Sequence, residues 1–305
     1  MRFFRTSEIL RGAATLTQPF SEGRGLPRRC ILLGLLFTSA VPAQACVRVA
    51  EVPLRLVDGF PVVGASLAGR SVSFVVDTGA QGMLVTPGIA EMLGLPLSGL
   101  TRVFGTGGSQ AARVVGLPGL RLGGAAMAEL SAPVLALPVA LEVAPPLAGL
   151  LGASLLSRFD LEFDLPGGRM ALWAPGDCAM PRGTVLPLEV SRAGEAFVPV
   201  RVNGQSLLAL VDSGSRATIL SEAVARRLGV SAPASANTAP GVDGVRLPVG
   251  HTRVRLGLGD EAAVEVPVSV APLQLDRGDM LLGLDQLGRR RVWVLYGRGV
   301  AVFGG

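Results

Sequence analysis

Apolar residues lie along the chain in short runs with β-type alternation, and turns rich in glycine separate these runs. Residues 62–67 and 70–76 are two such runs around a short turn, which predicts a β-hairpin. Residues 197–202 and 205–211 repeat the pattern around Asn-Gly, a strong hairpin signal. The pattern therefore predicts a mostly β protein.

Each opening hairpin is followed by the same series of shorter elements. A short helix is expected in each half, with Pro87 in the first turn of one and Ser221 as the N-cap of the other. In the first half the predicted elements are a helix at 88–93, strands at 117–122 and 132–137, an apolar-apolar-Gly element at 149–152 and a closing hairpin at 159–173. In the second half they are a helix at 221–228, an apolar-apolar-Gly element at 281–283 and a closing hairpin at 291–303.

The two halves are copies of one pattern. Adding 135 to a residue number carries Gly69 onto Gly204 and Asp77 onto Asp212 without a gap. At the centre of each copy, an apolar run ends in a carboxylate that is followed by a hydroxyl residue and a glycine. The glycine lets the chain turn sharply and brings a backbone amide close to the carboxylate.

The set of motifs resembles the aspartic proteases, and in particular the retropepsin-like type with two copies fused in one chain. The sequences that carry the resemblance are Asp-Thr-Gly-Ala at 77–80, Asp-Ser-Gly-Ser at 212–215 and the two later apolar-apolar-Gly elements. The resemblance covers nearly everything after residue 50. It implies a mostly β, bilobal fold of two retropepsin-like β-barrel lobes with short helices and an active site between the lobes.

The resemblance also implies roles for the repeated residues. Asp77 and Asp212 are expected to be catalytic, and the residues that support their loops are expected to be Thr78, Gly79, Ser213 and Gly214. Two carboxylates held close together cannot both ionise, so one stays protonated and the other acts as a base. Water attack on a peptide bond needs both an acid and a base, and no cofactor or metal is expected.

These features predict an aspartic endopeptidase that acts on a peptide or protein substrate. The alternative is a catalytically inactive peptide-binding or scaffold protein that keeps the fold. Two intact Asp-hydroxyl-Gly triplets favour the enzyme. The sequence departs from the family pattern at residues 81–83, and Arg216 is expected to place a cation near the pair and to depress its pKa.

A glycine-rich segment at 103–108 resembles the flap that closes over substrate in this family, with an ordinary surface hairpin as the alternative. Residues 231–244 contain few large apolar side chains, are expected to be mobile and contain a candidate second flap tip. The candidate substrate-binding residues are Phe104, Gly105, Thr106, Gly107, Gly241 and Val242.

Other chemistries find little support in the sequence. His251 is the single histidine, and no Gly-x-Ser-x-Gly elbow accompanies it, so we expect it to be an exposed strand residue. One histidine and two separated cysteines do not form a zinc site. A phosphate-binding loop with lysine is excluded because the chain contains no lysine.

The formal charge of +5 is concentrated near the N-terminus. Residues 1–45 contain six arginines and two glutamates, so they account for +4 of it. The rest of the chain lacks the basic stripe of a nucleic-acid groove, and we expect no nucleic-acid partner.

The first 45 residues are also typical of an export signal. Arg28 and Arg29 precede an apolar run at 30–41, and an Ala-x-Ala cleavage sequence ends at Ala45. Because the run is too short to span a bilayer comfortably, no stable membrane span is predicted. We expect a periplasmic or secreted protein. A lipoprotein anchored through Cys46 and a twin-arginine signal remain as alternatives.

Cleavage after this leader would leave two cysteines, Cys46 and Cys178. In an oxidising compartment an even pair indicates a disulfide, with two free thiols or an acylated Cys46 as the alternatives. The predicted organisation is a leader at 1–45, a first lobe at 46–175, a connector at 176–192 and a second lobe at 193–305. Both Asp triplets lie in one chain, so we expect a monomer.

Overall fold

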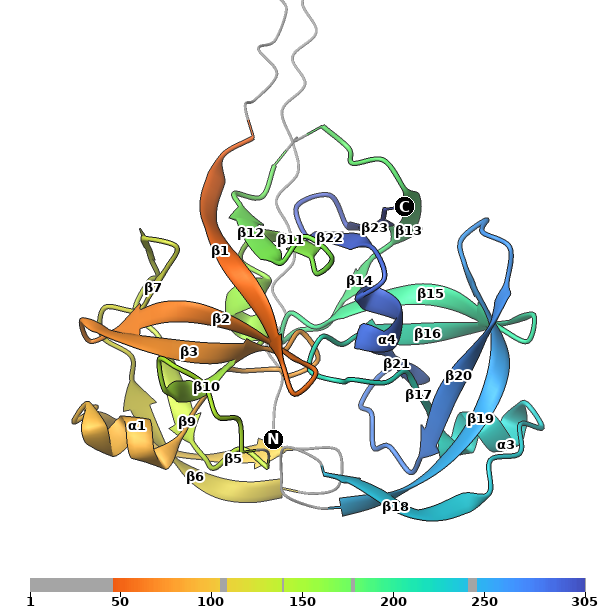
Figure 1. Ribbon diagram of the computed structural model, residues 1–305, viewed down its shortest axis with the longest axis horizontal. Coiled ribbons are helices and arrows are strands. Elements are labelled where there is room, and N and C mark those ends of the chain that lie inside the picture. The colour runs from red at the N-terminus through yellow and green to blue at the C-terminus, as the bar shows by residue number, and fades with distance from the viewer. Residues whose placement is uncertain (1–45, 105–108, 139, 177–178, 241–245, 305) are drawn as a thin grey trace, which may run out of the picture. The chain divides into compact units, whose positions relative to one another are not determined.

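The structure is a computed structural model that describes residues 46–104, 109–138, 140–176, 179–240 and 246–304, and strands make up most of it (Figure 1). The described strands form a 15-stranded sheet and an 8-stranded sheet. The predicted mostly β, two-lobed fold is confirmed.

The first lobe is built on the predicted opening hairpin, β2 and β3, whose strands pair along their whole length. Successive neighbours then extend the sheet to an edge at β5. In spatial order the strands are β2 (Phe60–Leu67), β3 (Arg70–Val76), β10 (Leu147–Leu151), β4 (Leu84–Val85), β9 (Ser131–Val134), β6 (Ser109–Gly116) and β5 (Leu97–Phe104). Two further short strands, β7 (Arg121–Leu122) and β8 (Ala125–Ala126), pair with each other, and β7 also pairs with β2.

The second lobe repeats this order and the sense of each pairing. β10 is parallel to β3 and antiparallel to β4, and β21 is parallel to β16 and antiparallel to β17. In spatial order the strands are β14 (Glu189–Val190), β15 (Ala196–Val202), β16 (Gln205–Val211), β21 (Met280–Leu282), β17 (Ile219–Ser221), β20 (Val264–Ala271), β19 (Arg246–Leu258) and β18 (Ala234–Pro240). The sequence repeat is therefore a structural repeat.

A run of six antiparallel strands joins the two lobes. Each half of the chain contributes three of them, and the halves meet where β11 pairs with β22, with Phe163 opposite Val292. In spatial order these strands are β1 (Arg48–Val57), β12 (Arg169–Trp173), β11 (Asp160–Asp164), β22 (Arg291–Leu295), β23 (Val300–Phe303) and β13 (Thr184–Pro187). Backbone hydrogen bonds thus cross from one lobe to the other.

The helices are short. The two that were predicted are α1 (Pro87–Met92) and α3 (Glu222–Arg227), and the structure adds α2 (Ala153–Leu156) and α4 (Leu284–Leu287), which were not predicted. The Ser221 hydroxyl caps α3 by accepting a hydrogen bond from the Val224 amide at 3.3 Å, and arginines in the last turn complement the helix dipole. Among the described residues, no helix is long and apolar enough to cross a bilayer.

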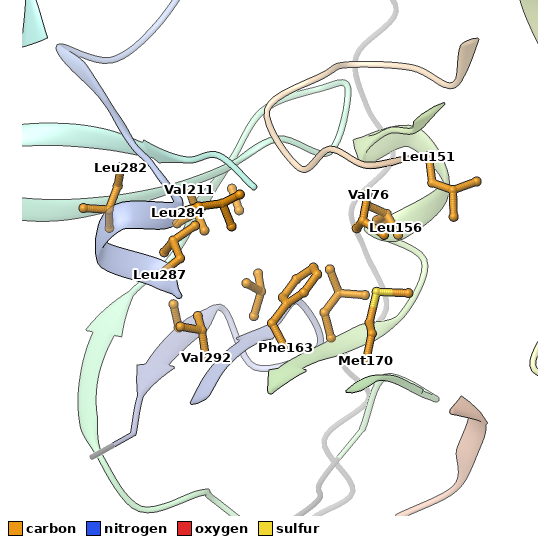
Figure 2. Close-up of a cluster of buried hydrophobic side chains, with 14 of the residues drawn as sticks. Val76, Leu151, Leu156, Phe163, Met170, Val211, Leu282, Leu284, Leu287 and Val292 are labelled. Atoms are coloured by element: carbon orange, nitrogen blue, oxygen red, sulfur yellow. The ribbon is translucent and has the colours of Figure 1, made fainter. Parts of the chain in front are cut away.

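A hydrophobic cluster continues from one lobe to the other beneath the point where β3 and β16 end. Figure 2 labels side chains from both halves in this cluster: Val76, Leu151, Leu156, Phe163 and Met170 from the first, and Val211, Leu282, Leu284, Leu287 and Val292 from the second. Val76 and Val211 are the last residues of their strands and are fully buried. This packing fixes the positions of Asp77 and Asp212, which directly follow these two valines.

Several segments differ from the predictions. The strand expected at 117–122 is confined to Arg121–Leu122, because a turn with positive φ at Gly119 interrupts it. The strand expected at 132–137 lies at Ser131–Val134. Within 231–244, expected to be mobile, Ala234–Pro240 forms β18 because its backbone pairs with β19. The segment expected to be a connector contains the two strands β13 and β14.

Truncating Phe163 tests whether the shared core holds the lobes together. Its side chain is 4% exposed and packs in the cluster of both halves, so Phe163→Ala is expected to lower the free energy of unfolding by about 3–5 kcal/mol. Urea denaturation measures the change. Phe104→Ala is the control, because Phe104 is 72% exposed and its loss is expected to cost less than about 0.5 kcal/mol. Equal effects of the two substitutions would contradict the shared core.

Candidate active site

Two equivalent turns follow the central strands of the lobes. We call residues 77–80 the first Asp loop and residues 212–215 the second Asp loop. The Asp77 amide donates to the Leu151 carbonyl at 3.0 Å, and the Asp212 amide donates to the Leu282 carbonyl at 3.0 Å. Each loop therefore leaves its strand at a point fixed by the neighbouring parallel strand.

Each aspartate is held by the amides of its own loop. The Oδ1 atom of Asp77 accepts hydrogen bonds from the Gly79 amide at 3.1 Å and from the Ala80 amide at 2.9 Å. The equivalent amides of the second loop donate to Oδ1 of Asp212 at 2.9 and 3.1 Å. One oxygen of each carboxyl group is thus fixed by the backbone, and the other takes no part in this turn.

The hydroxyl residues lock the two loops together. Thr78 Oγ1 donates to the Val211 carbonyl at 2.6 Å and accepts from the Ser213 amide at 3.0 Å. Reciprocally, Ser213 Oγ donates to the Val76 carbonyl at 2.8 Å and accepts from the Thr78 amide at 3.0 Å. Both hydroxyl groups are buried, and each satisfies two backbone groups of the other lobe. We call these four hydrogen bonds the hydroxyl brace.

The loop glycines bring the two carboxyl groups together. A Cβ atom added to Gly79 would lie 2.4 Å from Cγ of Asp212, and one added to Gly214 would lie 2.2 Å from Cγ of Asp77. These distances are far below van der Waals contact, so no larger residue fits at either position without moving the opposite aspartate. Each carboxyl group therefore packs directly on the backbone of the other lobe's loop.

Burial and proximity shift the ionisation of the pair. The pKa of Asp77 is raised to about 6, mainly because burial disfavours its charge, while the amides of Ala80 and Gly79 act in the opposite direction. The pKa of Asp212 is raised to about 8, first by burial and next by the negative charge of Asp77. The two side chains also share a hydrogen bond. The pair therefore favours the state that holds one proton.

The glycine that ends each apolar-apolar-Gly element packs against the backbone just after one Asp loop. A Cβ atom on Gly152 would lie 1.9 Å from the Gly82 carbonyl oxygen, and one on Gly283 would lie 2.3 Å from the Ala217 carbonyl oxygen. In the second lobe, Thr218 adds a contact that the sequence analysis missed, because its hydroxyl accepts from the Gly283 amide at 3.2 Å. Only glycine permits these approaches.

The residue after each Asp loop reaches the opposite lobe. Gln81 Nε2 lies 3.5 Å from Oε2 of Glu195. Arg216 Nη1 lies 3.4 Å from the Asp58 carbonyl oxygen, and its guanidinium group stacks over the Phe60 ring at 5.2 Å. The predicted effect of Arg216 on the pair is not seen. Arg216 is not among the groups that shift the pKa of Asp77 or Asp212, and its guanidinium group is directed at the other lobe's turn.

Phe104 is the remaining candidate residue that the structure describes. Phe104 ends the edge strand β5 with its ring exposed. The other candidate substrate-binding residues, Gly105, Thr106, Gly107, Gly241 and Val242, lie outside the described residues, so the two flaps stay predictions.

Cys46 is disulfide-bonded. Cys178 lies outside the described residues, so the pairing of these two cysteines stays a prediction. His251 is an exposed residue of β19, as expected, and its Nδ1 atom lies 3.4 Å from the Ser269 hydroxyl. Within the described part of the chain, no group of three or more His, Cys, Asp or Glu side chains is arranged to hold a metal ion.

The fold and the two loops define a protein of two similar β lobes that share one paired-carboxylate site. A family model described as gag-polyprotein putative aspartyl protease matches residues 198–289, and a model described as aspartyl protease matches residues 63–155. A search of curated proteins finds no match. Each matched segment contains one Asp loop. The chain thus carries two aspartyl protease domains in tandem, consistent with two retropepsin-like repeats.

The raised pKa of Asp212 predicts how stability depends on pH. The folded pKa of about 8 exceeds the usual value near 3.8, so the folded state retains a proton that the unfolded state releases. Stability is therefore lost as pH rises from about 4 toward about 8. Asp212→Asn removes this loss, and the variant is expected to gain stability over wild type at pH 8, on the order of a few kcal/mol, with little difference at pH 4.

Thermal unfolding of both proteins between pH 4 and 8 measures this difference. Asp260→Asn is the matched control, because Asp260 is exposed and its removal is expected to change stability by less than about 0.5 kcal/mol. A constant offset between wild type and Asp212→Asn across the pH range would contradict a raised pKa.

Proposed function

We propose that the chain is an exported aspartic endopeptidase that hydrolyses peptide bonds with water activated by Asp77 and Asp212. The observation that carries this proposal is the reciprocal packing of two carboxyl groups, each against the backbone of the opposite Asp loop. Such a pair holds one proton and one negative charge, so it offers an acid and a base within the same site.

The asymmetry between the two aspartates supports an assignment of roles. Asp77 is the more exposed of the two and its charge is better solvated, so it acts as the base that removes a proton from the attacking water. Asp212, which carries the proton, donates it to the carbonyl oxygen of the substrate as the oxygen of water bonds to the carbonyl carbon. The C–N bond of the resulting diol then breaks: the proton held by Asp77 passes to the leaving nitrogen, and Asp212 takes a proton from one diol hydroxyl, which becomes the carbonyl of the new carboxyl group.

The chemistry needs nothing beyond these two groups and water, so we propose an enzyme without a cofactor that acts on peptide or protein substrates. The amides of each Asp loop hold one carboxylate oxygen, which leaves the second oxygen to contact the water or the substrate. Both halves of the site come from one chain, and the hydroxyl brace joins them, which supports a monomeric enzyme.

Export is supported by two observations. Residues 28–45 have the charge and apolar pattern of a secretory signal, and Cys46, directly after the cleavage sequence, is disulfide-bonded. A disulfide occupies the sulfur that a lipid anchor would require, so it favours a periplasmic or secreted protein over a lipoprotein. N-terminal sequencing of protein from an exporting cell is expected to begin at Cys46. A mature protein that begins at Met1 would contradict this proposal.

The catalytic proposal is tested by a peptide library that is incubated with wild type, Asp77→Asn, Asp212→Asn and the double variant and then read by mass spectrometry. Each single variant is expected to lose at least about a thousandfold in rate, nearly as much as the double variant, because acid and base act as one unit. Circular dichroism verifies that each variant is folded.

The matched control is Asp260→Asn, in which an exposed aspartate is changed and wild-type cleavage is expected. Initial rates should rise in proportion to wild-type concentration, since one chain forms the whole site. Full activity in either single variant would refute the intrachain pair. A wild type that binds peptides without cleaving them would establish the alternative of an inactive peptide-binding protein.

A further inference from the structure

The two Asp loops are nearly identical, but the symmetry between the halves breaks immediately beyond them. Gln81 and Arg216 are equivalent by the 135-residue offset, and both are exposed. The same offset relates Phe60 to Glu195, the residues that these two side chains contact in the opposite lobe. One end of the site therefore presents a neutral amide beside a carboxylate, and the other presents a guanidinium group beside an aromatic ring.

The positive charge at the Arg216 end is available to a ligand. Its guanidinium group hydrogen-bonds a backbone carbonyl and stacks over Phe60. Within the described part of the chain, no carboxylate forms an ion pair with Arg216. Stacking on an aromatic face holds an arginine in a fixed direction while leaving donors of its planar group free.

The negative charge at the opposite end comes from Glu195. Its carboxylate accepts a hydrogen bond from the Ser191 hydroxyl at 2.8 Å and lies within 3.5 Å of the neutral Gln81 amide, so neither partner cancels its charge. Asp276 adds a second negative charge nearby, which raises the pKa of Glu195 in addition to the larger effect of burial. The arginine that follows Asp276, Arg277, is paired with Glu189 instead.

The two lobes repeat the same strand order, so a substrate that lies across the Asp pair meets these two ends with its two halves. The scissile bond must lie at the Asp pair, so the chain on either side of it extends toward equivalent positions of the two lobes. Where the lobes are alike, both halves of a peptide find the same surroundings. At the Glu195 and Arg216 ends they find opposite charges, so only one direction of a peptide with unequal charges is favourable.

We propose that this charge difference determines substrate specificity: the site prefers peptides with an acidic side chain on the half that lies toward Arg216 and a basic side chain on the half that lies toward Glu195. This inference rests on the proposed function, because it takes the Asp pair as the point of cleavage. Arg216 and Glu195 are specificity-determining residues that belong to the second lobe and act at the two ends of the same site, each beside a residue of the first lobe.

The test compares the cleavage sites that wild type, Arg216→Gln, Arg216→Glu and Glu195→Gln select from a randomised peptide library. Wild-type sites should be enriched roughly threefold in Asp or Glu at one fixed position and in Arg or Lys on the other side of the scissile bond, as expected for partly exposed ion pairs. Arg216→Gln should abolish only the acidic preference, and Arg216→Glu should convert it to a basic one. Glu195→Gln should abolish only the basic preference.

Arg253→Gln and Glu265→Gln are matched controls, because these two exposed residues of the second lobe pair with each other on β19 and β20. Their cleavage preferences should equal those of wild type. Wild-type preferences without charge, or an acidic preference that survives Arg216→Glu, would overturn the inference.

The same library is also captured on the Asp77→Asn protein, and the bound peptides are sequenced. If wild type cleaves nothing but the captured peptides show the two charge preferences, the proposed catalysis is wrong and the charge recognition is right. If wild type cleaves peptides without regard to charge, the catalysis stands and this inference fails.

Discussion

The hydroxyl brace is the interaction on which the site depends. Thr78 and Ser213 bury their hydroxyl groups against backbone groups of the opposite lobe, where an unpaired amide or carbonyl would be costly. Each hydroxyl satisfies one donor and one acceptor, so neither loop can move without leaving buried polar groups unpaired. The brace thereby holds two carboxyl groups in contact although their charges repel each other and their burial disfavours ionisation.

The brace can act in this way because the surrounding fold is rigid on both sides. Val76 and Val211 end their strands in one continuous apolar cluster (Figure 2), and six antiparallel strands carry backbone hydrogen bonds between the lobes. Burial of apolar surface provides the free energy that keeps the carboxyl groups together. Holding the two carboxyl groups together is therefore unfavourable by itself, and the free energy gained in the shared core offsets it. Functional sites commonly contain such strained or unfavourable groups.

The parts of the fold that could be predicted are those with a local signal. Both hairpins and both Asp loops follow from alternation, turn residues and repetition. In β1 the buried residues Ala50, Val52 and Leu54 alternate with the exposed residues Glu51 and Pro53, so this strand could also have been predicted. β18 could not be predicted, because pairing with β19 and not its own composition makes it a strand. The approach of Glu195 to the first loop likewise depends on packing between lobes.

Fusion of the two copies in one chain removes a constraint that identical subunits obey. In a symmetric dimer both aspartates have the same surroundings, so acid and base roles are interchangeable until substrate binds. Here Asp212 is 8% exposed, Asp77 is more open, and their pKa values are raised to different extents. Because the two copies can diverge in sequence, the lobes can differ in the ionisation of their aspartates and in surface charge. The hydroxyl brace stays symmetric because it needs a hydroxyl group from each lobe. The duplication therefore allows the two ends of the site to differ, which exact two-fold symmetry would not allow.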